Sequence, residues 1–88
     1  MLDNQTRRKL EEIVKERIDM IKDSDEAYIY VKAFKERIKS IEIIRMGITE
    51  RVQITTEREH TLLLTLAQFL TKTIEVRKDG KVSKFIGS

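Results

Sequence analysis

The sequence contains no cysteine, no proline and no tryptophan, and it has only three glycines and one histidine among its 88 residues. The absence of cysteine excludes a disulfide framework and any thiolate metal site. One histidine excludes a His-rich metal site, and three isolated glycines exclude a P-loop or a dinucleotide-binding fingerprint. No apolar run reaches the ~18 residues that cross a membrane. The polar residues 1–5 also lack the apolar core of a signal peptide.

From these absences we expect a soluble, cytoplasmic protein with no cofactor, no membrane partner and no small-molecule substrate. The chain is 38% charged and 40% hydrophobic, with a net charge of +3. The charge balance and the many isoleucines argue against disorder. This Ile/Lys/Glu usage is typical of thermophile proteins and also of AT-rich genomes. The excess positive charge lies entirely in residues 72–88. We therefore expect a single domain over 1–88, with a helical core at 1–71 and a basic β-hairpin at 72–88.

Apolar periodicity predicts a mainly α fold with three helices, at about 3–22, 25–46 and 57–71. In the first segment, apolar residues recur every three or four positions. In the second, a similar stripe ends before Gly47, a natural helix stop. The third follows Thr56-x-x-Glu59, which has the pattern of a capping box. The short alternating piece 51–54 favours an extended connection. The predicted core is Ile13, Ile18, Val31, Phe34, Ile38, Ile41, Leu63, Leu66, Ala67 and Leu70.

A C-terminal β-hairpin is predicted over about 73–86. Asp79-Gly80 is a strong signal for a two-residue type I′ turn, in which both central residues need positive φ. With that turn, Val76 faces Ser83 and Ile74 faces Phe85. Glu75 then pairs with Lys84 on the opposite face, so the register is chemically consistent.

Nothing in the chain supports an enzyme. His60 has no partners for a metal site, and we interpret it as a polar residue in the first turn of the third helix. Asp23, Asp25 and Glu26 favour helix capping over a hard-cation site. We expect no catalytic, cofactor-binding or metal-ligating residues.

The basic residues form two groups that are candidates for nucleic-acid contact. Cations are disfavoured at a helix N-terminus, so the basic run at 7–9 calls for another explanation, such as phosphate binding. The hairpin lysines favour either phosphate contact by a wing or a solubilising tip that blocks strand pairing. The candidate contacts are Arg7, Arg8, Lys9, Lys72, Arg77, Lys78, Lys81 and Lys84.

A protein partner or a homodimer is also expected, because the second and third predicted helices are more apolar than one neighbour can cover. Tyr28 and Tyr30 lie two apart, which places them on different faces of a helix. The candidate interface residues are Tyr28, Ile43, Met46, Leu62 and Phe69.

The segment 29–42 resembles the long helix of GINS subunits, which are archaeal and eukaryotic replication factors. Arg37-Ile38-Lys39-Ser40-Ile41 matches that family's Arg-x-x-Lys-Ile pattern, with Ser40 in place of a lysine. Ile54-Thr55-Thr56-Glu57-Arg58-Glu59 matches the opening of its next helix. The resemblance covers about 29–70 and implies a non-catalytic replication scaffold.

Two functions follow as hypotheses. The first is a non-enzymatic protein-interaction module in DNA transactions, with a small replication accessory or scaffold subunit as its specific form. The second is a small, dimeric nucleic-acid-binding regulator, similar to a winged helix, that contacts phosphates through the basic hairpin. The leucine-rich third helix argues against a winged helix, because the reading helix should be polar.

Overall fold

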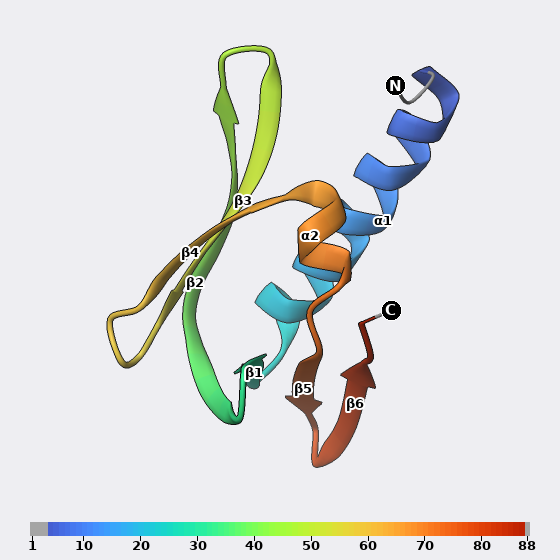
Figure 1. Ribbon diagram of the computed structural model, residues 1–88. Helices are drawn as coiled ribbons and strands as arrows, with labels where there is room; N and C mark the ends of the chain where they lie inside the picture. Colours follow the sequence, from blue (N-terminus) through green and yellow to red (C-terminus); the bar gives the residue numbers. More distant parts are fainter. Residues whose placement is uncertain (1–3, 88) are drawn as a thin grey trace.

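The computed structural model describes residues 4–87, which form one antiparallel sheet with two helices against it (Figure 1). The elements in chain order are α1 (Asn4–Asp23), β1 (Glu26–Val31), β2 (Phe34–Met46), β3 (Thr49–Thr56), β4 (Thr61–Thr65), α2 (Leu66–Leu70), β5 (Ile74–Lys78) and β6 (Lys81–Phe85). The strand order is β4-β3-β2-β1-β5-β6. Strand β1 is therefore paired along both sides, whereas β4 and β6 are the edges of the sheet.

The 13-residue strand β2 joins the two halves of the sheet. Its first part pairs with β1 and its second part pairs with β3. The register shifts between Ile38 and Ser40, which marks a β-bulge. A bulge bends a strand and increases its twist. In Figure 1 the β2–β3 hairpin accordingly extends away from β1, β5 and β6.

The predicted mainly α fold is wrong, because residues 25–46 form the β1–β2 hairpin instead of a helix. This segment is rich in β-branched and aromatic residues, which favour a pleated strand. Its apolar positions fit a helical stripe as well as an alternating one, because the hairpin interrupts the alternation. The turn residues are Lys32 and Ala33, and Lys32 adopts a φ of 57°. The turn contains no glycine, asparagine or proline, so the local sequence does not predict a turn at this position.

The predicted third helix at 57–71 is also wrong. Residues 57–60 form a loop, Thr61–Thr65 form β4, and only Leu66–Leu70 are helical. The capping box is present, but between Thr65 and Gln68. The predicted helical bundle is therefore absent from the described residues, and strands occupy most of the segment that resembles GINS subunits. The extended piece at 51–54 is confirmed as part of β3.

The first helix and the C-terminal hairpin are confirmed. Helix α1 covers Asn4–Asp23, and the predicted start at residue 3 lies outside the described residues. In the hairpin, Ile74 pairs with Phe85, Glu75 with Lys84 and Val76 with Ser83, as predicted. Asp79 and Gly80 both have positive φ, of 52° and 78°. Local turn chemistry was sufficient to set this register. No helix among the described residues is both long and apolar enough to cross a membrane.

The core lies between the helices and one face of the sheet. Val14, Ile18 and Ile21 of α1 and Phe69 of α2 pack with residues such as Ile29. Of the predicted core, Ile18, Ile41 and Leu66 are buried, and Val31, Ile38 and Leu70 are partly buried against them. Ile13, Phe34, Leu63 and Ala67 are exposed and were wrongly predicted. Helical periodicity assigned these four residues to the buried side of their elements, but they lie on the exposed side.

Phe69 was expected at an interface, but it is 1% exposed and belongs to the core. We expect Phe69→Ala to lower the free energy of unfolding by about 3–5 kcal/mol, because it leaves a cavity. Urea denaturation followed by circular dichroism measures the change. Ile48→Ala is the control, since Ile48 is 93% exposed, and it should change stability by less than about 0.5 kcal/mol. Equal stability of the two variants would place Phe69 outside the core.

Candidate nucleic-acid interface

Opposite the helices, the sheet presents a face of aromatic and charged side chains, which we call the open face. Side chains alternate between the two faces of a strand. Because Ala27, Ile29, Ile74 and Val76 point to the core, their neighbours point away from it. The open face consists of Glu26, Tyr28 and Tyr30 from β1, Lys35 and Arg37 from β2, Glu75 and Arg77 from β5, and Val82 and Lys84 from β6.

Tyr28 and Tyr30 share the open face, because residues two apart in a strand point the same way. The helical interpretation had separated them. The alternation of Tyr28, Ile29, Tyr30 and Val31 was the sequence signal that could have identified the pair. Both tyrosines are half-buried. The Tyr28 hydroxyl donates a 2.8 Å hydrogen bond to Glu26 Oε2, and this bond raises the pKa of the phenol.

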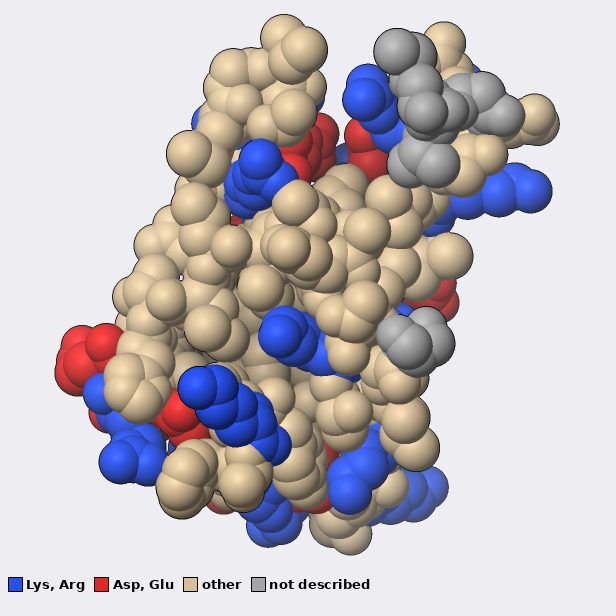
Figure 2. All heavy atoms as spheres, viewed as in Figure 1, with Lys and Arg blue, Asp and Glu red and all other residues tan. Residues whose placement is uncertain are grey.

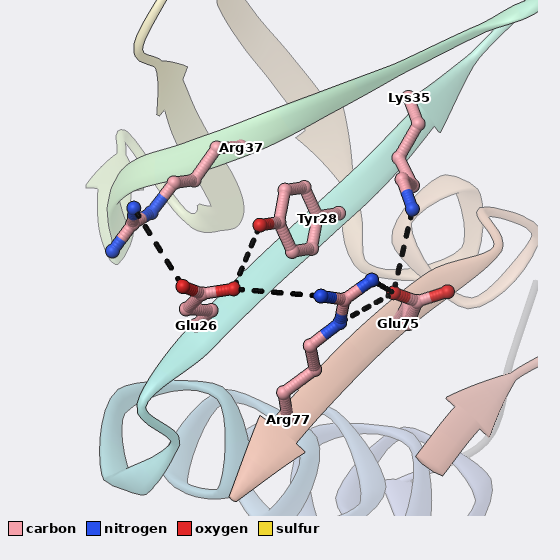
Figure 3. Close-up of polar contacts among 6 residues, drawn as sticks. All are labelled: Glu26, Tyr28, Lys35, Arg37, Glu75 and Arg77. Atoms are coloured by element: carbon pink, nitrogen blue, oxygen red, sulfur yellow. Dashed lines mark hydrogen bonds and ion pairs between the residues drawn. The ribbon is translucent and has the colours of Figure 1, made fainter. Parts of the chain in front are cut away.

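Four ion pairs connect the charged residues around Tyr28 (Figure 3). Arg77 lies between two carboxylates, 3.1 Å from Glu75 Oε2 and 3.8 Å from Glu26 Oε2. Lys35 lies 3.6 Å from Glu75 and Arg37 lies 4.0 Å from Glu26. Each carboxylate thus has two cationic neighbours, which holds the side chains in defined positions.

Glu75 is the buried member of this network, with 6% of its surface exposed. Burial by itself raises the pKa of the Glu75 carboxyl. The hydrogen bond from Arg77 and the charges of Lys35 and Arg77 outweigh that effect, so the pKa lies below its ordinary value. In turn, the hydrogen bond to Glu75 raises the pKa of Arg77. The pair is therefore fully ionised at neutral pH.

Three cations of the open face also lie against the tyrosine rings. Lys35 Nζ is 4.9 Å and Arg77 Cζ is 5.2 Å from the centroid of the Tyr28 ring. Lys84 Nζ is 5.1 Å from the centroid of the Tyr30 ring. Such contacts contribute about 0.5–1 kcal/mol at exposed sites. Lys35 and Arg77 are also held by their ion pairs, whereas among the described residues Lys84 has no ion pair, so another ligand can displace it from the Tyr30 ring.

The open face therefore combines two aromatic rings with four cations and only two acids. Both acids are already paired with cations of the same face. Lys35, Arg37 and Arg77 keep between a third and a half of their side-chain surface exposed. This arrangement has positive charge available for an anionic ligand and flat rings on which an aromatic ligand can stack.

Of the predicted nucleic-acid contacts, only Arg77 and Lys84 lie on the open face. Lys78 pairs with Asp23 on the helix side, and this pairing raises the pKa of Lys78. Lys81 pairs with Lys78 across the hairpin and points to the helix side as well. Lys72 lies between α2 and β5. Arg7, Arg8 and Lys9 are exposed residues of the N-terminal half of α1. The structure does not gather these residues into one patch.

A hollow of about 400 Å³ lies between the β2–β3 hairpin and the N-terminal part of α1. Figure 2 shows it at the top of the molecule, with basic and acidic side chains on its walls. Arg7, Glu11 and Arg51 contribute to these walls, together with an Arg45–Glu50 ion pair at 3.3 Å. Because cations and acids alternate there, the hollow has no preference for ligands of one charge.

The predicted interface residues are likewise dispersed. Tyr28 lies on the open face, and Met46 is exposed at the end of β2. Ile43 and Leu62 are partly buried and pack against the core, where Phe69 also lies. These five residues do not form a continuous surface for a protein partner.

Sequence reasoning missed a polar cluster in which the buried Glu36 and Thr56 contact the exposed His60. Glu36 is 4% exposed, and its Oε1 accepts a 2.8 Å hydrogen bond from the Thr56 hydroxyl. His60 Nδ1 lies 2.9 Å from the same oxygen. His60 was predicted in a helix, but it lies in the loop before β4. The hydrogen bonds with His60 and Thr56 lower the pKa of Glu36 despite its burial, so the cluster anchors the β3–β4 loop to β2.

The acidic cluster at 23–26 has a different role from the predicted helix capping, since no helix begins there. Asp23 pairs with Lys78, Asp25 accepts a 3.0 Å hydrogen bond from the Asp79 N–H, and Glu26 belongs to the open face. These contacts tie the end of α1 to the tip of the β5–β6 hairpin. In the described part of the chain, no group of three or more His, Asp or Glu residues could hold a metal ion.

The chain is 40% identical over 79 residues to "Uncharacterized protein 2" of Sulfolobus islandicus filamentous virus (isolate Iceland/Hveragerdi). The match covers 90% of this chain and 98% of the viral protein. No protein-family model matches the chain, and no solved structure matches it significantly.

The Glu36 cluster predicts a pH-dependent stability. We expect Thr56→Val to destabilise the fold by about 1–3 kcal/mol at pH 7, because the buried Glu36 carboxylate loses a donor. A lowered pKa stabilises the fold above the ordinary pKa of glutamate, and this stabilisation is lost as the pH falls through the folded pKa. The difference between wild type and Thr56→Val should therefore shrink at acidic pH. Urea titrations at pH 7 and pH 3 measure it, with Thr55→Val as the control on the opposite face. A difference that stays constant with pH would contradict this role for Glu36.

Proposed function

We propose that this chain, which belongs to the same family as Uncharacterized protein 2 of Sulfolobus islandicus filamentous virus, is a non-enzymatic protein. In this proposal it binds single-stranded nucleic acid through its open face. The observation that carries the proposal is the placement of Tyr28 and Tyr30 on the side of the sheet that the helices leave uncovered. Cations from both neighbouring strands surround them. Single-strand binding sites combine these same two elements, aromatic rings and a basic surface.

The relative strength of two contacts favours stacking of bases on these rings. An exposed cation on a tyrosine ring contributes about 0.5–1 kcal/mol. A base stacked on an aromatic side chain contributes about 1–3 kcal/mol. A base can therefore replace Lys84 on the Tyr30 ring. The displaced ammonium group then remains beside the strand, where it can pair with a phosphate.

The ion-pair network favours phosphate contacts around the rings. Lys35 and Arg37 lie on β2, and Arg77 and Lys84 lie on β5 and β6, so cations flank β1 on both sides. Glu26 and Glu75 fix the positions of three of these cations without neutralising all the positive charge. Preorganised cations lose less conformational entropy when a ligand binds. A sheet face is also broad and shallow, which suits a flexible single strand better than a duplex groove.

The proposal predicts that Tyr30 contributes to affinity through its ring. We expect Tyr30→Ala to weaken binding about 5- to 150-fold, which corresponds to about 1–3 kcal/mol of lost stacking. Tyr30→Phe keeps the ring and should bind within about twofold of wild type. Fluorescence anisotropy with a labelled oligothymidylate measures both affinities. Equal affinity of wild type and Tyr30→Ala would exclude the open face as the stacking surface.

Substitution of two lysines of β6 tests whether the open face or the hairpin tip contacts phosphate. Lys84 points to the open face and Lys81 to the helix side, on the same strand. We expect Lys84→Gln to reduce the slope of log affinity against log salt concentration by about 0.7, the value for one phosphate of a single strand. Lys81→Gln is the matched control and should leave the slope unchanged. A larger loss for Lys81→Gln would favour phosphate contact by the hairpin tip and would overturn binding through the open face.

A further inference from the structure

Strand β4 is an unusual edge strand, because its five residues carry no charge. They read Thr61-Leu62-Leu63-Leu64-Thr65, which is a palindrome about Leu63. Edge strands expose unpaired backbone groups and are commonly protected by lysine or by other charges. The opposite edge, β6, has that protection in Lys81 and Lys84. β4 lacks it, so its edge is open to another strand.

The hydrogen-bond pattern shows which backbone groups of β4 face outward. The Thr56 N–H donates to the His60 carbonyl at 2.9 Å, so Thr56 and His60 form a hydrogen-bonded pair. Hydrogen-bonded and non-hydrogen-bonded pairs alternate along an antiparallel ladder. Leu62 and Leu64 therefore bond to β3, whereas the backbone groups of Thr61, Leu63 and Thr65 point away from it. The Thr65 N–H is already bonded to Gln68 Oε1 at 2.9 Å, and the Thr65 carbonyl, at the N-cap position, accepts the first hydrogen bond of α2. Leu63 therefore has the free backbone groups at the centre of this edge.

We propose that β4 pairs antiparallel with β4 of a second copy of this chain, about a twofold axis at Leu63. This register aligns Leu63 with Leu63 of the second copy, and Thr61 with Thr65 of the second copy. The two Leu63 residues exchange both of their backbone hydrogen bonds. The Thr65 N–H keeps its bond to Gln68, so the pairing leaves the capping box of α2 intact.

The side chains and charges of β4 fit this self-pairing. Leu63 is 49% exposed on the face away from the helices, and the twofold axis brings the two Leu63 side chains together. Leu62 and Leu64 meet one another on the helix side, and the threonines meet at both ends. No like charges face each other within this strand pair. An isologous interface needs a surface that is complementary to itself, and the palindrome supplies it.

This pairing extends the sheet from one copy into the next. The twofold axis is perpendicular to the sheet at the junction, so the open faces of the two copies lie on the same side. Dimerisation in this way doubles the surface available to a ligand without covering Tyr28 or Tyr30. The free protein can dimerise in this way, and the pairing does not depend on nucleic-acid binding.

Sedimentation equilibrium without any nucleic acid tests the dimer. We expect wild type to have twice the 10.4 kDa mass of one chain. Leu63→Lys should raise the dissociation constant of the dimer at least about tenfold, because like charges directly opposite each other repel. Ile48→Lys is the matched control and should leave the constant unchanged, since Ile48 is 93% exposed at the tip of the β2–β3 hairpin. A monomeric wild type, or a Leu63→Lys variant as dimeric as wild type, would overturn the proposal.

A second variant tests the register even if Leu63→Lys fails to fold. The chain has no cysteine, so Leu63→Cys introduces a single thiol. The Cα atoms of a hydrogen-bonded pair lie about 5.5 Å apart. A short bis-maleimide should therefore link two Leu63→Cys chains in high yield at micromolar concentration. Ile48→Cys is the control and should react without forming a dimer. Equal yields of linked dimer from the two variants would contradict pairing through β4.

Discussion

The alternation of side chains along β1 is the constraint on which the rest of the structure depends. β1 is hydrogen-bonded to β2 on one side and to β5 on the other, so each of its residues has only two directions available. Ala27 and Ile29 point towards α1 and are buried. Tyr28 and Tyr30 must then point away from the helix. The alternation of β1 therefore determines both the core and the open face. A shift of its register by one residue would move the tyrosines to the core side and Ala27 and Ile29 to the open face.

Each face of the sheet has a buried carboxylate that neighbouring cations or hydrogen bonds stabilise. On the open face, two carboxylates each pair with two cations, and the half-buried tyrosines lie among them. Glu75 is almost fully covered, yet it stays ionised because Arg77 and Lys35 are beside it. On the helix side, Glu36 is stabilised by hydrogen bonds with His60 and Thr56. Buried carboxylates of both faces are thus paired, as the cost of burying a bare charge requires.

The two edge strands of the sheet, β6 and β4, differ in charge. β6 carries lysines on both of its faces, and one of them contacts Tyr30 of the open face. β4 has only leucine and threonine, and it is followed at once by the capping box of α2. Charged residues oppose association of edge strands, whereas an uncharged, self-complementary strand favours it. The proposed pairing through β4 and the proposed ligand surface around β1 therefore occupy separate parts of one sheet.

The sequence by itself determined those features that local chemistry controls. The amphipathic stripe of α1 and the Asp79-Gly80 turn were each sufficient, because the residues that decide them lie within a few positions of one another. The exclusion of disulfide and thiolate metal chemistry also needed only the composition. Among the candidate site residues, Tyr28, Arg77 and Lys84 were singled out from sequence, although Tyr28 was assigned to a protein interface on a helix.

Only the tertiary structure decided the remainder, since segments 25–46 and 57–71 fit both a helical and an extended pattern. The β1–β2 turn at Lys32 has no glycine, asparagine or proline, and its positive φ is imposed by the pairing of the strands on either side. Glu36 interrupts the apolar alternation of β2, and its burial is satisfied by Thr56 and His60, which lie 20 and 24 residues away. The open face, too, joins the β1–β2 hairpin to the β5–β6 hairpin, which are distant from each other in sequence. Contacts over such distances depend on which strands become neighbours, and no local pattern contains that information.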